Sequence, residues 1–169
     1  MTSRNLKRIA VSGGTIAVLL ALAIMVVMGS GKIAKAEDDG SRNGLEGAWR
    51  LQLTVRDCQT GAALRTFPAL FTFAKGGTLT ATTAGQSPAL FTPNLGVWRH
   101  VNDHSYSAVS EAFVFSPAGA WIQTHRLTRA IEIGEDGNEF TDTVALEIFD
   151  TNGNVIVRGC GTSVATRFK

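Results

Sequence analysis

The chain predicts an all-β fold, an eight-stranded antiparallel up-and-down barrel preceded by an N-terminal apolar helix. An apolar residue is followed four positions later by a glycine four times, at Phe73/Gly77, Phe115/Gly119, Ile133/Gly137 and Phe149/Gly153. Stretches of alternating apolar and polar residues flank each pair, which is typical of strands joined by hairpin turns. After residue 36, no stretch shows the sustained apolar periodicity of a helix.

The strands are expected to follow one another through short, turn-forming connections. In chain order they are Ala48–Asp57, Thr66–Phe73, Thr78–Thr83, Gly96–Val101, His104–Phe115, Ala120–Ile133, Glu139–Asp150 and Val155–Phe168. Glycine, asparagine, aspartate and proline occupy most of the connections, as turns require. The segment from Ala84 to Leu95 is longer, and Pro88 and Pro93 predict that it is a loop. A barrel of eight strands has room inside for packed side chains or for one small ligand.

The first 36 residues have the composition of an export signal. Basic residues precede an apolar run over residues 16–28, and Ala34 and Ala36 are the small residues that a signal peptidase reads. We expect a signal peptide over 1–36, a disordered leader over 37–45, and a barrel domain over 46–169. The mature chain would be periplasmic or secreted. The alternative is an uncleaved helix over residues 9–31 that anchors the chain in the inner membrane.

Removal of this segment changes the sign of the net charge. Five of the 16 Lys and Arg residues precede Glu37 and all 14 Asp and Glu residues follow Ala36, which leaves 11 basic residues and a net charge of −3. A weakly acidic domain with scattered charges gives no reason to expect binding to nucleic acid or to an anionic lipid surface.

Cys58 and Cys160 are the two cysteines of the chain. In an exported protein they predict one disulfide, with two free buried thiols as the alternative. Alternation puts both on the outward rows of the first and last strands. If they lie directly opposite each other, Leu51 opposes Arg167, the first strand pairs with the last, and the sheet closes.

Gly47-Ala48-Trp49 opens the first strand, and Arg167 lies near the end of the last. This G-x-W motif resembles that of the calycin barrels, which include lipocalins, fatty-acid-binding proteins and avidins. The resemblance implies that Trp49 plugs the closed end of the barrel and that Arg167 packs over it, both in structural roles. The whole chain is similar to a group of small exported bacterial lipocalin-like proteins, which implies no particular ligand.

Side chains on the predicted inward rows are candidates for lining a ligand site. The apolar candidates are Phe71, Phe73, Trp98, Phe113, Trp121 and Phe140. Glu111 shares the face of Phe113, and His125 shares the face of Trp121, so both could be polar anchors for a ligand. Arg129 and Asp142 would either pair inside the barrel, Arg129 also being able to pair with Glu111, or be solvated near its mouth.

The favoured interpretation is an exported barrel that binds a small, hydrophobic ligand and has no catalytic activity. One alternative is a packed barrel that acts as an interaction or structural module through the 84–95 loop. Its apolar residues Leu90, Phe91 and Leu95 would form an exposed patch or a lid. The other is an isomerase-type enzyme with His125 and Glu111 as acid and base, which requires both on one face of the sheet.

Metal and cofactor sites are not predicted. The three histidines, His100, His104 and His125, do not have the spacing of a metal-binding motif, and no C-x-x-C occurs. The sequence also lacks a G-x-S-x-G nucleophile motif and a phosphate-binding glycine loop. We therefore expect no cofactor, no metal ion and no catalytic residue.

Overall fold

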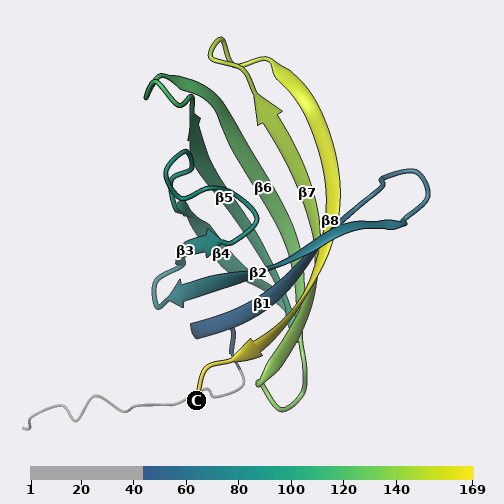
Figure 1. Ribbon diagram of the computed structural model, residues 1–169. Helices are drawn as coiled ribbons and strands as arrows, with labels where there is room; N and C mark the ends of the chain where they lie inside the picture. Colours follow the sequence, from purple (N-terminus) through teal and green to yellow (C-terminus); the bar gives the residue numbers. More distant parts are fainter. Residues whose placement is uncertain (1–43) are drawn as a thin grey trace, which may run out of the picture. The chain divides into compact units, whose positions relative to one another are not determined.

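A computed structural model describes residues 44–169, which form eight antiparallel strands closed into a barrel (Figure 1). The strands are β1 (Gly47–Arg56), β2 (Ala63–Ala74), β3 (Thr78–Thr83), β4 (Asn94–Asn102), β5 (Ser105–Phe115), β6 (Trp121–Ile133), β7 (Glu139–Phe149) and β8 (Val155–Arg167). Each strand pairs with the next one in the chain, which confirms the predicted all-β topology. Within residues 44–169 there is no helix long and apolar enough to cross a membrane. The predicted signal peptide, with its alternative membrane anchor, lies outside the described residues.

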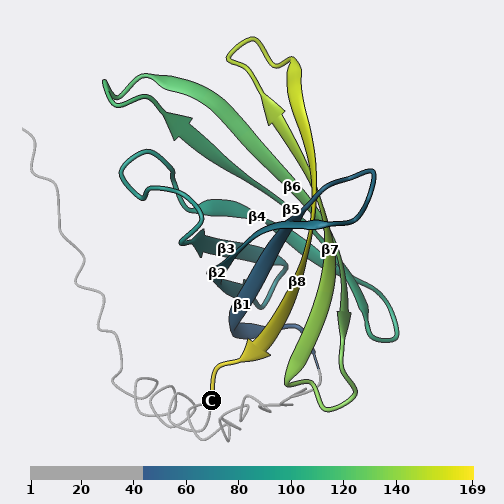
Figure 2. The ribbon, with the colours of Figure 1, turned by 45° about the vertical axis from the view of Figure 1, so that its right-hand side comes forward.

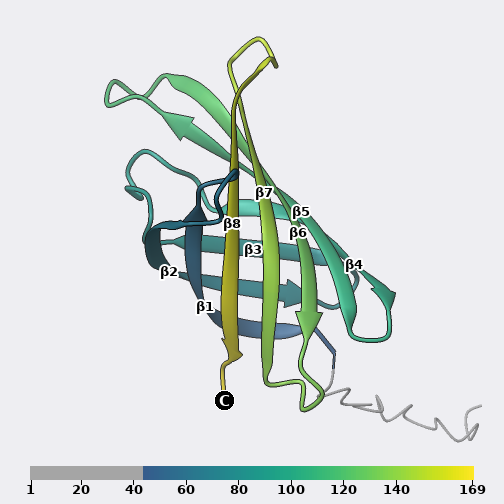
Figure 3. The same ribbon diagram turned by 90° about the vertical axis from the view of Figure 1, so that its right-hand side faces the viewer.

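The four glycine turns connect β2 to β3, β5 to β6, β6 to β7 and β7 to β8, as predicted. Gly119 and Gly153 have φ angles of 81° and 85°, a left-handed conformation that glycine adopts without steric cost. The β7–β8 hairpin is the longest projection of the sheet and reaches past the other strands at one end of the barrel (Figures 1 and 3).

The barrel closes through antiparallel pairing of β1 with β8, and β7, β8 and β1 lie side by side (Figure 3). The predicted register is wrong by two residues. Trp49, rather than Leu51, lies opposite Arg167, and Arg56 rather than Cys58 lies opposite Cys160. The reason is that β1 ends at Arg56, so Cys58 lies in the following turn and reaches β8 from outside the ladder.

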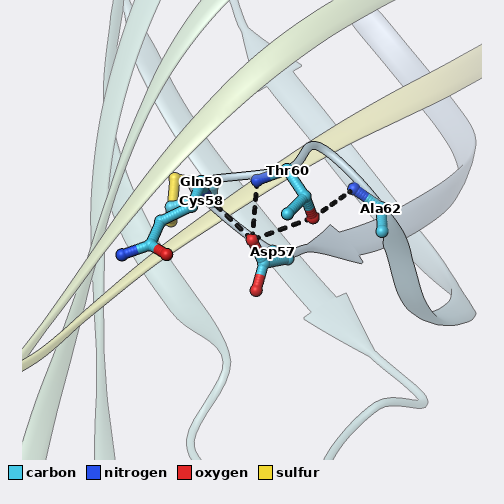
Figure 4. Close-up of a disulfide and its surroundings, with 6 residues drawn as sticks. Asp57, Cys58, Gln59, Thr60 and Ala62 are labelled. Atoms are coloured by element: carbon cyan, nitrogen blue, oxygen red, sulfur yellow. Dashed lines mark hydrogen bonds between the residues drawn. A yellow bond between two sulfur atoms is a disulfide. The ribbon is translucent and has the colours of Figure 1, made fainter.

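The turn after β1 positions Cys58 for its disulfide with Cys160, in which the two Cα atoms are 5.3 Å apart (Figure 4). The Asp57 carboxylate accepts hydrogen bonds from the backbone N–H groups of Gln59 and Thr60, at 2.9 and 2.8 Å, and from the Thr60 hydroxyl. These bonds, that of the Thr60 N–H first, lower the pKa of Asp57 below its ordinary value. The carboxylate therefore fixes the turn on both sides of Cys58. This disulfide is consistent with an oxidising compartment.

One end of the barrel is filled by aromatic side chains. Trp49 is completely buried, its ring lies 4.8 Å from that of Phe140, and its indole N–H donates to the Leu45 carbonyl. The Arg167 guanidinium lies 4.2 Å from the centre of the Trp49 ring and donates to the Gly137 carbonyl. Trp49 and Arg167 therefore lie at the closed end with the contacts that the calycin resemblance implies.

Candidate functional site

Beyond this packed end, the interior of the barrel has a cavity of about 190 Å³ that is partly open to solvent. All eight strands contribute residues to its lining, together with the loop between β3 and β4. The walls are mainly apolar, formed by residues that include Leu53, Val55, Phe67, Phe71, Leu127 and Leu146. The inward row of β7 passes from the packed core at Phe140, through Asp142, to the cavity wall at Val144. The cavity therefore begins where the aromatic core ends.

A buried ion pair separates the core from the cavity. Arg129 on β6 lines the cavity and is 2% exposed, and its Nη1 donates to the Asp142 carboxylate and, at 3.2 Å, to Ser163 Oγ. Asp142 also accepts hydrogen bonds from the backbone N–H of Ser163, at 2.7 Å, and from its hydroxyl. The Arg129 guanidinium lies 4.5 Å from the centre of the Phe71 ring. The two charges compensate each other, as burial of an arginine requires.

Two residues of the cavity lining each have one buried polar atom without a hydrogen-bond partner. Among residues 44–169, the buried side-chain nitrogen and oxygen atoms that make no hydrogen bond are Arg129 Nε and Asn94 Oδ1. Asn94 begins β4 and is 7% exposed. Buried polar groups are normally paired in folded proteins, and an unpaired group often marks a functional position. Both atoms have almost no accessible surface, so they are buried in the barrel wall and not presented to a ligand in the cavity.

The loop between β3 and β4 covers the other end of the cavity, on the side where the β5–β6 hairpin also turns (Figure 2). Phe91 lines the cavity and forms an isolated β-bridge with Val114. The Leu90 carbonyl accepts a hydrogen bond from the Phe115 N–H at 2.9 Å, and the Thr92 N–H donates to the Phe113 carbonyl at 3.1 Å. The sequence allowed this loop to be an exposed patch or a lid. Phe91 lines the cavity, which is the position expected of a lid.

His125 lies in the cavity lining below this loop. It is 9% exposed, its ring centre is 5.1 Å from that of Phe91, and its Nε2 is 3.4 Å from the side-chain oxygen of Gln123. Burial lowers the pKa of His125 from its ordinary value of 6.5, because the imidazolium loses hydration. The neutral imidazole is therefore the stable form at neutral pH.

The low pKa of His125 predicts a pH dependence of stability. The unfolded chain binds a proton at His125 near pH 6.5, whereas the folded chain binds it only at a lower pH. The free energy of unfolding should therefore fall as the pH falls from 6.5 toward the pKa of His125 in the folded chain. Each unit of difference in pKa corresponds to about 1.4 kcal/mol. Urea unfolding at pH 7.5, 6.5, 5.5 and 5.0 should show this slope in the wild type and a reduced slope in His125→Gln.

The exposed His104 provides the matched control for this measurement. His104→Gln should leave the slope between pH 7.5 and 5.0 unchanged. An NMR titration that gave His125 a pKa of 6.5 or higher in the folded protein would contradict the prediction, because no proton uptake would then accompany unfolding.

The structure brings only some of the predicted site residues to the cavity. Phe71 and His125 line it. Phe73, Phe140 and Trp98 pack in or against the closed-end core, below the ion pair.

Glu111 and Phe113 were expected to face inward, and this is wrong. Ser110, at 3% exposed, lines the cavity instead, and Glu111 forms an ion pair with Arg126 on the outer surface, with side chains 42% and 46% exposed. Phe113 is 48% exposed. The alternation on β5 is therefore the reverse of the prediction, and the inward residues are small. Glu111 and His125 lie on opposite faces of the sheet, so the acid–base pair of an isomerase does not form.

Trp121 was also expected to face inward and is instead 44% exposed, with its ring centre 6.0 Å from that of Phe113. The β5–β6 register shifts between Val114 and Phe115. Such a bulge interrupts the two-residue alternation, so counting back from His125 gives the wrong face for Trp121.

Asn94 and Ser110 are cavity residues that the sequence pattern did not single out. Asn94 falls within the segment expected to be a loop, and Ser110 lies on the row of β5 that was assigned to the outside. Ser110 is buried between Ala108 and Ala112 on alternate positions of β5, and their small size gave no sequence signal for the inward row.

Known proteins provide no further guide to this site, since the chain matches no protein-family model and no curated protein. Among residues 44–169, no group of three or more His, Cys, Asp or Glu side chains is arranged to hold a metal ion. What the site can do chemically therefore follows from its own geometry. It can surround a small apolar molecule, and His125 and Ser110 are polar residues of its lining.

Proposed function

We propose that this chain is an exported binding protein whose barrel holds one small, largely apolar molecule. The observation that carries the proposal is the cavity of about 190 Å³ that lies between the packed closed end and the loop containing Phe91. A barrel with a purely structural role gains stability from a continuous core, because empty space forfeits packing contacts. Export is supported by the composition of residues 1–36 and by the disulfide, since disulfides persist in oxidising compartments.

The volume of the cavity limits the size of the ligand. Pockets for drug-sized molecules measure about 300–1,000 Å³. An apolar cavity of about 150 Å³ in another protein binds benzene. A cavity of about 190 Å³ therefore fits one substituted ring or a short aliphatic chain. A long fatty acid or a multi-ring ligand exceeds this volume and would have to extend out of the open end of the cavity.

Titration with toluene, followed by amide NMR shifts, tests the proposed binding. Saturable shifts are expected at cavity positions such as Leu127 and Ser110. Gly159 offers a way to fill the cavity, because its added Cβ would lie at an ordinary contact distance of 3.4 Å from Leu146 Cδ2. Gly159→Leu should weaken toluene binding by at least about tenfold, since the new side chain occupies the apolar space that the ligand needs.

Val164 on the same strand is the control position, because its side chain is 57% exposed on the outer face. Val164→Leu adds volume outside the barrel and should leave toluene binding unchanged. The absence of saturable shifts in the wild type up to the solubility limit of toluene would refute the proposed function.

A further inference from the structure

The opening of the cavity is marked by the solvent-exposed residues of its lining. Three lining residues are exposed, and all three are polar: Arg65, Thr82 and Gln86. Arg65 lies near the start of β2, Thr82 near the end of β3, and Gln86 in the loop that follows β3. A ligand in the cavity would therefore have its apolar part among buried side chains and one end beside polar, hydrated residues.

Arg65 carries the charge at this opening that no carboxylate balances. The lining contains two charged residues, Arg65 and Arg129, and no Asp or Glu. Asp142 compensates Arg129, and the buried His125 is neutral at neutral pH. Within residues 44–169, Arg65 makes no ion pair. The opening therefore has a net positive charge, which favours an anionic group over a neutral or cationic one.

Two contacts hold the Arg65 guanidinium at the edge of the cavity. Its Cζ lies 4.7 Å from the centre of the Phe67 ring, which is part of the cavity wall, and its Nη2 donates to the Gly85 carbonyl at 2.8 Å. The Gly85 backbone lies directly against the same ring, since an added Cβ would be 2.5 Å from Phe67 Cε2. Within residues 44–169 the guanidinium makes no other hydrogen bond, so most of its five N–H donors are available to a ligand.

We propose that the ligand is a small organic acid whose apolar part, one ring or a short chain, occupies the cavity and whose carboxylate binds to Arg65 at the opening. A planar guanidinium can donate two parallel hydrogen bonds to a carboxylate. A carboxylate at the opening also keeps part of its hydration, which avoids the cost of burying a charge. This inference rests on the proposed function, because it specifies the ligand of the same cavity.

Three one-ring probes that differ in their end group test the charge of the ligand. At pH 7.5, 3-phenylpropionate is an anion, 3-phenylpropanol is neutral and 3-phenylpropylamine is a cation. Calorimetric titration of the full mature chain at low salt should give the anion an affinity about fivefold higher than that of the alcohol, and the amine the lowest affinity. Raising the salt concentration to about 0.5 M should reduce the difference between anion and alcohol, because salt screens exposed charges.

One variant and its matched control assign this selectivity to Arg65. Arg65→Met should make 3-phenylpropionate bind no tighter than the alcohol, while the affinities for toluene and the alcohol change less than about twofold, because the apolar stem is kept. Arg158→Met removes the same charge from an exposed position outside the cavity lining and should leave the selectivity unchanged. Circular dichroism establishes that both variants are folded.

The outcomes distinguish this inference from the proposed function. If toluene and the alcohol bind but 3-phenylpropionate binds no tighter than the alcohol, or if Arg65→Met keeps the selectivity for the anion, the proposed ligand class is wrong and the binding function stands. If neither toluene nor any of the three probes binds the wild-type chain, the binding function itself fails, and the ligand class fails with it.

Discussion

Replacing both cysteines by serine should lower the free energy of unfolding by about 2–5 kcal/mol. The disulfide joins residues 102 positions apart. A crosslink over a loop of that length removes much of the conformational freedom of the unfolded chain, worth roughly 4–5 kcal/mol in the chain-entropy model. The disulfide also links the turn after β1 to β8. Because β1 and β8 are the first and last strands, their pairing closes the barrel. Urea unfolding of Cys58→Ser/Cys160→Ser against the wild type measures the loss.

The slope of the unfolding curve gives a second readout of the same change. Without the crosslink the unfolded chain is more expanded and exposes more surface, so the dependence of unfolding free energy on urea concentration should become steeper. Reductant provides the control. It should destabilise the wild type toward the level of the double variant and leave the double variant unaffected. A variant within about 0.5 kcal/mol of the wild type would contradict the entropic account.

The overall fold was predictable because its signals are local. A glycine turn needs only a few residues, and alternation over β1 correctly predicts that Trp49, Leu51 and Leu53 are buried. Pairing of the first strand with the last also followed from the two cysteines. The error of two residues in that register arose because a disulfide can join a turn to a strand as well as two paired strands.

The candidate site was harder to predict because the cavity weakens the sequence signal that marks a core. On β5 the inward residues are Ala108, Ser110 and Ala112, whereas the larger Val109 and Phe113 are exposed. Of these three residues Ser110 lines the cavity, whereas Ala108 packs in the closed-end core. A rule that assigns large apolar residues to the interior therefore fails on the strand that helps to create the cavity.

The position of Arg129 and Asp142 depended on register, which the sequence did not define. Arg129 lies opposite Val144 and Ile131 lies opposite Asp142, so the two charged residues are diagonal neighbours on paired strands. A shift of one residue in either strand would have moved the charged residue of that strand to the solvent and left the other without its partner. The alternative of solvated charges near the mouth is therefore wrong, and the predicted pairing of Arg129 with Asp142, rather than with Glu111, is the one that forms.

Breaking this buried ion pair should destabilise the barrel by about 3–5 kcal/mol for either single substitution. Arg129→Met leaves the Asp142 carboxylate buried with Ser163 as its remaining hydrogen-bond partner. Asp142→Asn leaves the Arg129 charge without a counterion. The double variant has neither charge, and the amide introduced in place of the Asp142 carboxylate retains an acceptor for the Ser163 N–H. Its loss of stability should be smaller than the sum of the single losses by about 2–3 kcal/mol, as measured by a urea-unfolding double-mutant cycle.

The surface pair Arg126–Glu111 is a control on the neighbouring hairpin, which shares β6. The two residues lie opposite each other on β6 and β5, and their side chains are about half exposed. The cycle of Arg126→Met and Glu111→Gln should give a coupling below about 1 kcal/mol, because water screens exposed charges. A coupling equally small for Arg129 and Asp142 would mean that water reaches the guanidinium. The double-mutant cycle therefore tests, without any ligand, whether the Arg129–Asp142 pair is shielded from water as its burial indicates.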